Sequence, residues 1–239
     1  MVFLVESEKV KDAIMPHMKP KITAKTRWSL FPKALTTPFS VAHVEDFAAQ
    51  FGIVSRRDGG HGAWPIKPRK DSGTHSETLG EARFHTDAQY HERPERAFIL
   101  ACECPAQDGG ENLLLSVEHA REAALESVGE EGLDLLEQPI WSWRTPSVFR
   151  TSDAPECSPD TAVFQIDGTM RWRFDNLVCK NEKQADVATR FADALDRSPH
   201  TVRVLLEPGD VLLCDNWYVL HARTHFQDRN RLLYRVRLD

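Results

Sequence analysis

From residue 96 onward the chain consists largely of short apolar segments separated by turn residues, and this pattern restricts the fold more than any other feature. The strand-like segments are RAFILACEC (96–104), ENLLLS (111–116), TAVFQI (161–166), TMRWRF (169–174), TVRVLLE (201–207), DVLLCD (210–215) and RLLYRVRL (231–238). The turns that join them contain Asp108-Gly109-Gly110, Asp167-Gly168 and Pro208-Gly209, and such glycine turns are typical of β-hairpins. Many short strands with few helices predict a mainly β fold, a barrel or jelly roll with flanking helices.

Three segments have the periodicity of a helix rather than that of a strand. They are residues 41–52, which we expect to end at Gly52, residues 117–136, and residues 182–197, for which Asn181 is the expected N-cap. Residues 53–80 are rich in Gly, Pro, Ser and Lys, and they predict a long, lid-like loop. We therefore expect one domain over residues 1–239, with an N-terminal helix and loop (1–80) and a jelly-roll core (81–239).

The composition is that of an ordinary globular protein. Of 239 residues, 41% are hydrophobic and 28% are charged, and the net charge is -6, which predicts no nucleic-acid or membrane partner. The N-terminus lacks the basic-then-apolar order of a signal peptide. The five cysteines form no zinc-type C-x-x-C pairs, and Cys102 and Cys104 lie in an apolar segment. We therefore expect buried thiols and a cytoplasmic protein, and nothing in the sequence indicates the oligomeric state.

Three H-x-[DE] units could each supply two ligands of an iron site made of two histidines and one carboxylate. They are His43-Val44-Glu45, His75-Ser76-Glu77 and His85-Thr86-Asp87. Residues two apart in a strand point to the same face, so both side chains of such a unit can reach one ion. Any one unit can equally be a solvated pair. Context favours His85 and Asp87, because the first unit begins a helix, the second lies in the polar loop, and only the third precedes an apolar strand region.

The third ligand has to come from a distant part of the chain. The segment EPGDVLLCDNWYVLHARTHF (207–226) contains two candidates, His221 at the end of an apolar run and His225 four residues later. We expect His221 to bind the metal. His225, which lies closer to a polar turn, is the alternative.

The last strand-like segment places Arg231, Leu233, Arg235 and Arg237 on one face. A guanidinium binds a carboxylate through two parallel hydrogen bonds. Arg231 and Arg235, 10 and 14 residues after His221, are therefore candidates for binding a dicarboxylic cosubstrate beside the metal. We expect Arg237 to lie in water.

Together these segments resemble the TauD/TfdA (taurine dioxygenase and clavaminate synthase-like) family of oxygenases. The resemblance lies in FHTD (84–87), CPAQDGGENLLL (104–115) and LEPGDVLLCDNWYVLHARTHF…RLLYRV (206–236), in this order and at these distances. It implies a double-stranded β-helix (jelly-roll, cupin-like) core, Fe(II), 2-oxoglutarate as cosubstrate and O₂. It also implies that His85, Asp87 and His221 are the metal ligands and form the catalytic centre.

The resemblance further implies how 2-oxoglutarate is held. Arg235 would bind its C5 carboxylate, and Arg231 would assist at the C1 end. Where the family usually has Thr, 25 residues after Asp87, this chain has Asn112, whose amide can donate the same hydrogen bond. A halogenating branch of the family has Gly or Ala in place of the carboxylate, so the presence of Asp87 argues against halogenation.

The segment TMRWRFDN (169–176) resembles a stretch that places Arg and Asp near the substrate in the amino-acid-hydroxylating branch. Arg171, Arg173 and Asp175 are therefore candidate substrate-binding residues, unless the two arginines simply line the solvent face of a hairpin. Further candidates are Gln89, Tyr90, His61 and Trp64, whereas Trp141 and Trp143 are expected to be packing residues.

These features predict an Fe(II)/2-oxoglutarate-dependent dioxygenase that hydroxylates an unactivated C–H bond of a free amino acid or a small amino-acid-derived metabolite. The cosubstrate would be decarboxylated to succinate and CO₂. Alternatives are desaturation or epoxidation by the same iron chemistry, or action on a sulfonate or aryloxy acid. An alternative of another class is a catalytically inactive jelly-roll protein that binds a metal or a ligand.

Overall fold

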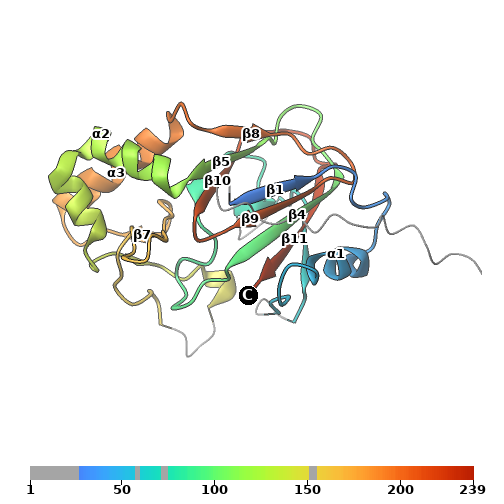
Figure 1. Cartoon of the computed structure of the whole chain (residues 1–239), viewed down its shortest axis with the longest axis horizontal. Coiled ribbons are helices and arrows are strands. Elements are labelled where there is room, and N and C mark those ends of the chain that lie inside the picture. The colour runs from blue at the N-terminus through green and yellow to red at the C-terminus, as the bar shows by residue number, and fades with distance from the viewer. Residues whose placement is uncertain (1–26, 57–59, 71–74, 151–154) are drawn as a thin grey trace, which may run out of the picture.

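The computed structural model describes residues 27–56, 60–70, 75–150 and 155–239, which contain two main antiparallel sheets flanked by helices (Figure 1). The larger sheet has the order β1-β9-β4-β11-β2, with β1 Trp28–Phe31, β9 Val211–Asp215, β4 Ala97–Cys104, β11 Leu232–Leu238 and β2 Ala63–Ile66. The smaller sheet has the order β3-β10-β5-β8, with β3 Ala82–His85, β10 Val219–Arg223, β5 Asn112–Ser116 and β8 Val202–Val204. The remaining elements besides the α-helices are the pair β6 (Ser142–Trp143) and β7 (Leu177–Val178) and the 3-10 helices η1 (His75–Glu77) and η2 (Ser147–Phe149).

The two main sheets pack against each other, and apolar side chains between them form the inner core. Along β4, Phe98, Leu100 and Cys102 belong to this inner core, whereas Ile99 and Ala101 belong to the core on the opposite face of the sheet. This alternation is the two-residue period of a strand that is buried on both faces. The predicted fold class, a mainly β jelly roll with flanking helices, is confirmed.

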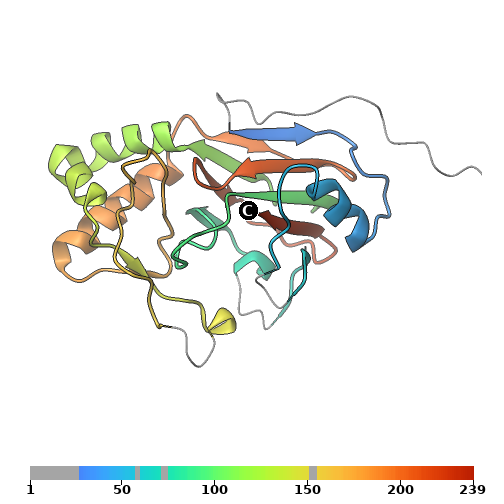
Figure 2. The ribbon, with the colours of Figure 1, turned by 60° about the horizontal axis from the view of Figure 1, so that its bottom comes forward.

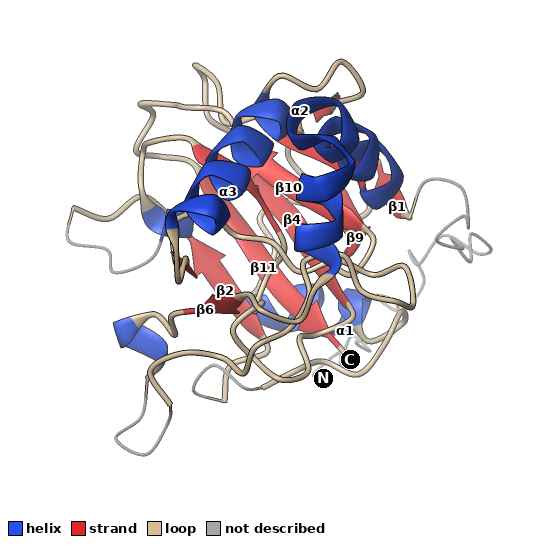
Figure 3. Cartoon of the chain, turned by 90° about the vertical axis from the view of Figure 1, so that its left-hand side faces the viewer, coloured by secondary structure: helices blue, strands red, loops and turns tan. Residues whose placement is uncertain are grey.

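The helices cover the outer faces of the two sheets, at opposite sides of the molecule (Figures 1 and 2). Helix α1 (Val41–Ala48) packs through Val44 and Ala48 against the larger sheet. Helices α2 (Val117–Glu137) and α3 (Glu182–Asp196) lie side by side over the smaller sheet, as Figure 3 shows. Their apolar residues share one core with Leu115 of β5 and Leu220 of β10.

Each α-helix begins at a polar N-cap whose side chain accepts a hydrogen bond from the third backbone N–H of the helix. The N-caps are Ser40, Ser116 and Asn181, and such caps satisfy N–H groups that have no partner within the helix. The expected cap at Asn181 is confirmed. Helix α2 is kinked at Gly129, which has a φ of 70° and therefore divides the predicted helical segment in two.

The predicted hairpin over residues 161–174 is only partly correct. Its turn exists, with Gly168 at a φ of 80° and a hydrogen bond from Gln165 N–H to Thr169 O of 2.8 Å. Beyond the turn, the two arms share one isolated bridge, between Phe164 and Met170, and one hydrogen bond, from Arg171 N–H to Val163 O (2.9 Å). The backbone of Met170 and Trp172 bonds to Trp217 and Thr86 instead, so these residues do not form a regular ladder.

Several element boundaries also differ from expectation. Helix α1 ends at Ala48, four residues before Gly52, and the expected loop 53–80 contains strand β2 and η1. The strands that the sequence pattern missed include β1, β2 and β3, which lie at sheet edges. Pro65 is compatible with β2 because an edge strand tolerates a residue without an N–H group.

The remaining expectations concern cysteines, tryptophans and the N-terminus. Cys102 is buried as expected, whereas Cys104 is half-buried, and all five cysteines are free. Trp141 and Trp143 are fully buried, as expected of packing residues. Within the described ranges, no helix combines the length and the apolarity needed to cross a membrane. The first 26 residues of the predicted N-terminal region lie outside the described residues.

Candidate metal centre and active site

The pairing of two strands of the smaller sheet brings two histidines together. His221 of β10 is the register partner of His85 at the end of β3, and their ring centroids are 4.2 Å apart. Leu220 and Ala222, the neighbours of His221, face the helices, so the alternation along β10 directs His221 toward the inner face of the sheet. There its ring packs on Phe98 of the larger sheet, with a centroid distance of 4.4 Å.

Asp87 follows strand β3 and is positioned by hydrogen bonds rather than by the strand itself. Its backbone N–H donates to Asn216 Oδ1 (2.7 Å), and Asn216 Nδ2 donates to the Asp87 carbonyl (3.1 Å). The preceding Thr86 N–H donates to Trp172 O (2.7 Å), and the following Ala88 has a φ of 56°. The expected strand geometry for the His-x-Asp unit is therefore wrong beyond His85, because β3 ends there. Asn216 lies within the segment 206–236 that carries the family resemblance, but the sequence analysis gave it no role.

The three side chains present donor atoms at distances that suit one metal ion. Asp87 Oδ1 lies 3.9 Å from His85 Nε2 and 3.8 Å from His221 Nε2. Donors that each bind an ion at about 2.1 Å can be at most about 4.2 Å apart. The His85 Nδ1–H donates to Arg83 O at 2.8 Å, which leaves the lone pair of Nε2 directed at the shared position. The residues present therefore fit a divalent transition metal.

The charges around this triad favour the forms that bind metal. Burial alone would raise the pKa of the Asp87 carboxyl, but Arg235, His221 and His85 outweigh it and hold that pKa well below its usual range. Burial, with His221 and Arg173 nearby, holds the pKa of His85 well below its usual range, although Asp87 opposes this effect. An ionised carboxylate and a neutral imidazole are the ligand forms that a metal requires.

The other candidate ligands have different surroundings. The Nδ1 of His43 accepts a hydrogen bond from the Ser40 N–H at the start of α1, and Glu45 accepts one from Ala63 N–H. His75 begins η1. His225 is exposed beyond the end of β10, and the cluster of potential ligands that includes His221 does not contain it.

A cavity of about 390 Å³ opens beside the triad. Its lining includes six arginines and two aspartates: Arg144, Arg173, Arg223, Arg231, Arg235, Arg237, Asp87 and Asp175. Apolar side chains that include Tyr90, Phe98 and Leu100 complete the wall. A concave, partly apolar cavity with an excess of guanidinium groups suits a small anionic ligand.

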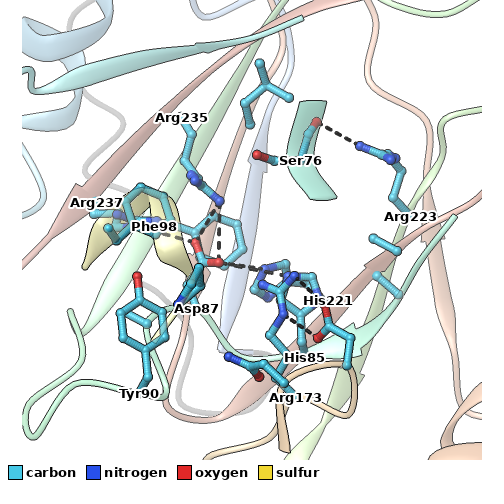
Figure 4. A pocket seen from close by; sticks show the side chains of 18 of the residues that line it. Ser76, His85, Asp87, Tyr90, Phe98, Arg173, His221, Arg223, Arg235 and Arg237 are labelled. Carbon is cyan, nitrogen blue, oxygen red and sulfur yellow. Dashed lines mark hydrogen bonds and ion pairs between the residues drawn. The ribbon is translucent and has the colours of Figure 1, made fainter. Parts of the chain in front are cut away.

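Two arginines of β11 contact Asp87 directly (Figure 4). Arg235 Nη1 lies 3.1 Å from Asp87 Oδ2, and Arg237 Nε lies 3.6 Å from the same atom. The expectation that Arg237 lies in water is wrong, since its side chain is only 10% exposed. The reason is that both faces of β11 are covered: Val236 and Leu238 pack in the core of α1, and the arginine face lines the cavity.

Arg231 lies at a different part of the cavity wall, away from Asp87. The residue is 3% exposed, and its guanidinium lies over the ring of Phe226 at 4.9 Å. Among the described residues it has no acidic partner and no hydrogen bond. Burial lowers the pKa of Arg231 to about 10, so the group remains cationic at neutral pH. Gly110 makes room for it, because a Cβ there would lie 3.1 Å from Arg231 Nε.

Asn112 lines the cavity together with Arg231. It is the register partner of Arg223, two residues beyond His221 along β10, and its Nδ2 donates a 3.4 Å hydrogen bond to Val204 O. The guanidinium of Arg223 already forms hydrogen bonds within the protein, since it donates to the backbone carbonyls of Ser76, Thr78 and Gly80. It thereby joins η1 and the segment after it to β10, and Figure 4 shows the bond to Ser76.

The structure places only part of the expected substrate residues at the cavity. Arg173 and Asp175 line it and form an ion pair with distances of 2.6 and 3.1 Å. Arg171 does not, because its side chain donates to the carbonyls of His91 (2.8 Å) and Glu92 (2.6 Å).

Gln89 is fully buried behind the cavity wall, where its amide donates to Asn176 Oδ1 at 2.8 Å. Tyr90 lines the cavity, whereas His61 and Trp64 do not; their rings contact each other instead. The sequence analysis missed Arg144, Phe149 and Asn176, which line the cavity from the loops around β6 and β7.

Comparison with known proteins identifies the family. Residues 30–237 match the model of the family described as "Taurine catabolism dioxygenase TauD, TfdA family". Asparagine oxygenase in complex with Fe(II), 2S,3S-3-hydroxyasparagine and succinate has a similar structure, with a TM-score of 0.66, 19% identity, and coverage of 78% of this chain and 59% of that chain. Non-heme iron oxygenase OrfP in complex with Fe and alpha-ketoglutaric acid gives a TM-score of 0.62, 21% identity, and coverage of 82% and 62%.

This chain therefore spans less than two thirds of the length of either structure, and at these identities the likeness concerns the fold. The family match covers most of the sequence and includes His85, Asp87, His221 and the arginines of β11. The chain belongs to the TauD, TfdA dioxygenase family.

Proposed function

We propose that the chain is an Fe(II)/2-oxoglutarate-dependent dioxygenase that hydroxylates a small amino-acid-like substrate. The observation that carries this proposal is the position of the His85, Asp87 and His221 donor atoms beside a cavity lined by six arginines. The overall reaction would convert 2-oxoglutarate, O₂ and a C–H bond to succinate, CO₂ and a C–OH group. When bound, iron would supply the activation of O₂ that is coupled to this decarboxylation.

His85, Asp87 and His221 would hold the iron and leave coordination positions open for the cosubstrate and O₂. The hydrogen bond from His85 Nδ1–H to Arg83 O and the packing of His221 on Phe98 orient the two imidazoles. Asn216 fixes the peptide of Asp87. These contacts support a site that is formed before the metal arrives, which limits the cost of ordering the ligands.

We assign the distal carboxylate of 2-oxoglutarate to Arg231 and Asn112, and the region next to the metal to Arg235. The keto-acid end of the cosubstrate has to lie at the metal, and Arg235 already contacts the ligand Asp87. Arg231 lies four residues before Arg235, or about 13 Å in an extended chain, and its buried cation has no anionic partner among the residues that the structure describes. This order of the two arginines is the reverse of the order that the family resemblance implied.

The substrate would lie on the opposite side of the triad, against Arg173, Asp175, Tyr90 and Asn176. A cation and an anion that are paired at the cavity wall can be shared with the carboxylate and ammonium groups of an amino acid. Similar structures support this class, since that of asparagine oxygenase holds hydroxyasparagine and another structure of OrfP holds (3S)-hydroxy-L-Arg. A sulfonate or aryloxy acid could use only the cationic member of the pair.

A screen of succinate release over amino acids and their derivatives, with Fe(II) and 2-oxoglutarate present, tests the proposal. We expect stimulation by at least one zwitterionic compound and a product heavier by one oxygen atom. A product lighter by two hydrogen atoms would indicate desaturation. Absence of succinate with every compound, in a preparation that binds iron and 2-oxoglutarate, would support the non-catalytic alternative.

A further inference from the structure

A second group of metal-ligating side chains lies outside the active-site cavity. It consists of His119 and Glu122 in the first turns of α2 and of His200 in the connection between α3 and β8. One donor atom from each of the three lies within 4.8 Å of the other two. None of these residues lines the cavity beside His85, Asp87 and His221.

The two imidazoles are stacked face to face. Their centroids are 4.1 Å apart with an interplanar angle of 7°, and His200 Nε2 lies 4.0 Å from Glu122 Oε2. Two donors bound to one ion at about 2.1 Å are separated by no more than about 4.2 Å. The lone pair of an imidazole lies in its ring plane, so rings stacked in this way direct their lone pairs side by side. At least one ring therefore has to turn about its side-chain torsions to bring the three donors to a common ion.

A hydrogen bond to the N-cap of α2 restrains the ring of His119. The hydroxyl of Ser116, the N-cap of α2, accepts the His119 backbone N–H at 3.3 Å and lies 3.3 Å from His119 Nδ1. With the proton on Nδ1 donated to this hydroxyl, the lone pair of His119 is on Nε2. A hydrogen bond from the non-ligating nitrogen is the usual second contact of a metal-bound histidine.

The connection that carries His200 is also ordered by local hydrogen bonds. His200 N–H donates to Ser198 Oγ (3.4 Å), and Thr201 Oγ1 donates to Ser198 O (3.0 Å). The side chains of Glu122 and His200 are 62% and 50% exposed, and they border a hollow of about 260 Å³ that Glu126 and Arg197 also line. An ion from solvent can therefore reach the donors, although Arg197 offsets part of the favourable negative charge.

We propose that His119, Glu122 and His200 form a second divalent transition-metal site that binds Zn(II). Two imidazoles and one carboxylate match the ligands of zinc, whereas Mg(II) and Ca(II) prefer sets of oxygen ligands. The site has three protein ligands and leaves one tetrahedral position for water. A bound ion would join the start of α2 to the connection after α3 and so stabilise the helical layer over the smaller sheet. This proposal does not depend on the activity proposed for the main site.

Zinc stoichiometry measured on the metal-free full chain tests the proposal, with a chromophoric chelator as competitor. Because the main triad also accepts zinc, wild type should bind two equivalents. His221→Ala and His200→Ala should each bind one, and the double variant none. Two equivalents in His200→Ala, or one in the double variant, would overturn the proposal.

Two further measurements separate loss of a ligand from loss of folding. Glu122→Gln should weaken zinc binding at the second site by about tenfold or more, whereas Glu126→Gln, one turn further along the same helix, should not change it. Zinc should raise the midpoint of thermal unfolding of His221→Ala but not that of His221→Ala/His200→Ala. Equal zinc shifts in these two proteins would show that the histidines of the second site bind no metal.

Discussion

His221 lies directly opposite His85 in the antiparallel pairing of β10 with β3, and their imidazole centroids are 4.2 Å apart. The register of the sheet, set by the apolar neighbours of His221, therefore brings together two candidate ligands that are 136 residues apart in the sequence. A one-residue shift would turn His221 toward the helices. The metal site thus depends on the same alternation that forms the core.

The choice between the two histidines of the β10 segment can be tested by substitution. His221→Ala should lower Fe(II) affinity by more than about 100-fold, beyond the usual effect of a residue that only supports a ligand. His225→Ala should leave it unchanged, because His225 is exposed beyond the strand. Equilibrium metal binding under anaerobic conditions is the measurement. A loss of Fe(II) affinity in His225→Ala equal to that in His221→Ala would transfer the ligand assignment to His225.

Substitution of Arg231 tests the proposed order of the two arginines. Removal of one partner of a buried charge pair costs about 2–5 kcal/mol, so Arg231→Met should raise the Kd for 2-oxoglutarate by about 30-fold or more. Arg229→Met, an exposed change in the turn before β11, is the matched control and should have no effect. If Arg235→Met weakened cosubstrate binding while Arg231→Met did not, the order implied by the family resemblance would be right.

Asn216→Ala should damage both the fold and the metal site. Its side chain makes three buried hydrogen bonds, two with the Asp87 peptide and one with Glu95 O. We expect the free energy of unfolding of the metal-free protein to fall by about 3 kcal/mol and metal affinity to fall about 10–100-fold. Asn230→Ala, at the exposed turn before β11, is the control. If Asn216→Ala were destabilised but bound the metal as tightly as wild type, the hydrogen bonds from Asn216 to the Asp87 backbone would not be needed for metal binding.

The sequence predicted the fold class because the central strands carry strong local signals. Strands β4, β5 and β9 are apolar segments next to glycine turns, and β11 is a strand-length segment that follows a polar turn. The edge strands β1, β2 and β3 were missed, because each has only four residues and so shows too little of the two-residue period of a strand. The hairpin expected around Gly168 does not form a ladder, because its first arm bonds to Leu136 and its second arm to Trp217 and Thr86. These are tertiary effects that turn residues cannot reveal.

Sequence motifs predicted the three residues of the candidate metal site. They did not predict the site residues whose positions depend on packing between distant segments. His85, Asp87 and His221 were found from spacing and context, and the structure brings them together. The position of Arg237 was mispredicted. The alternation along a strand predicts which side chains share a face of the sheet, but it does not predict what packs on that face. Asn216, Arg144 and Asn176 were missed because they reach the site through loops.

The paired variants Arg173→Met and Arg171→Met test the substrate side of the cavity. Arg173 lines the cavity, whereas Arg171 bonds to loop carbonyls outside it. We expect Arg173→Met to raise the KM for the amino-acid substrate about tenfold or more, with little change in the KM for 2-oxoglutarate. Arg171→Met should leave both KM values unchanged and lower the free energy of unfolding by about 1–2 kcal/mol. The opposite pattern would place the substrate elsewhere.

Cysteine reactivity should follow burial. Burial raises the pKa of Cys102 to about 12 and holds that of Cys214 well above its usual range, so neither forms the reactive thiolate near pH 8.5. Iodoacetamide should modify the exposed Cys179 first, at a rate that increases with pH, and should reach Cys102 and Cys214 only after denaturation. Mass spectrometry of peptides is the measurement. Labelling of Cys102 in the folded protein at the rate of Cys179 would contradict the buried position.

In the proposed active site, one ion held by His85, Asp87 and His221 binds 2-oxoglutarate in the cavity that Arg231 lines. Anaerobic addition of Fe(II) and then 2-oxoglutarate, followed by visible absorption, tests it most directly. We predict a weak metal-to-ligand band in the middle of the visible range that is absent in His221→Ala, requires more 2-oxoglutarate in Arg231→Met, and is unchanged in His225→Ala. Absence of the band in wild type, or its persistence in His221→Ala, would contradict the claim.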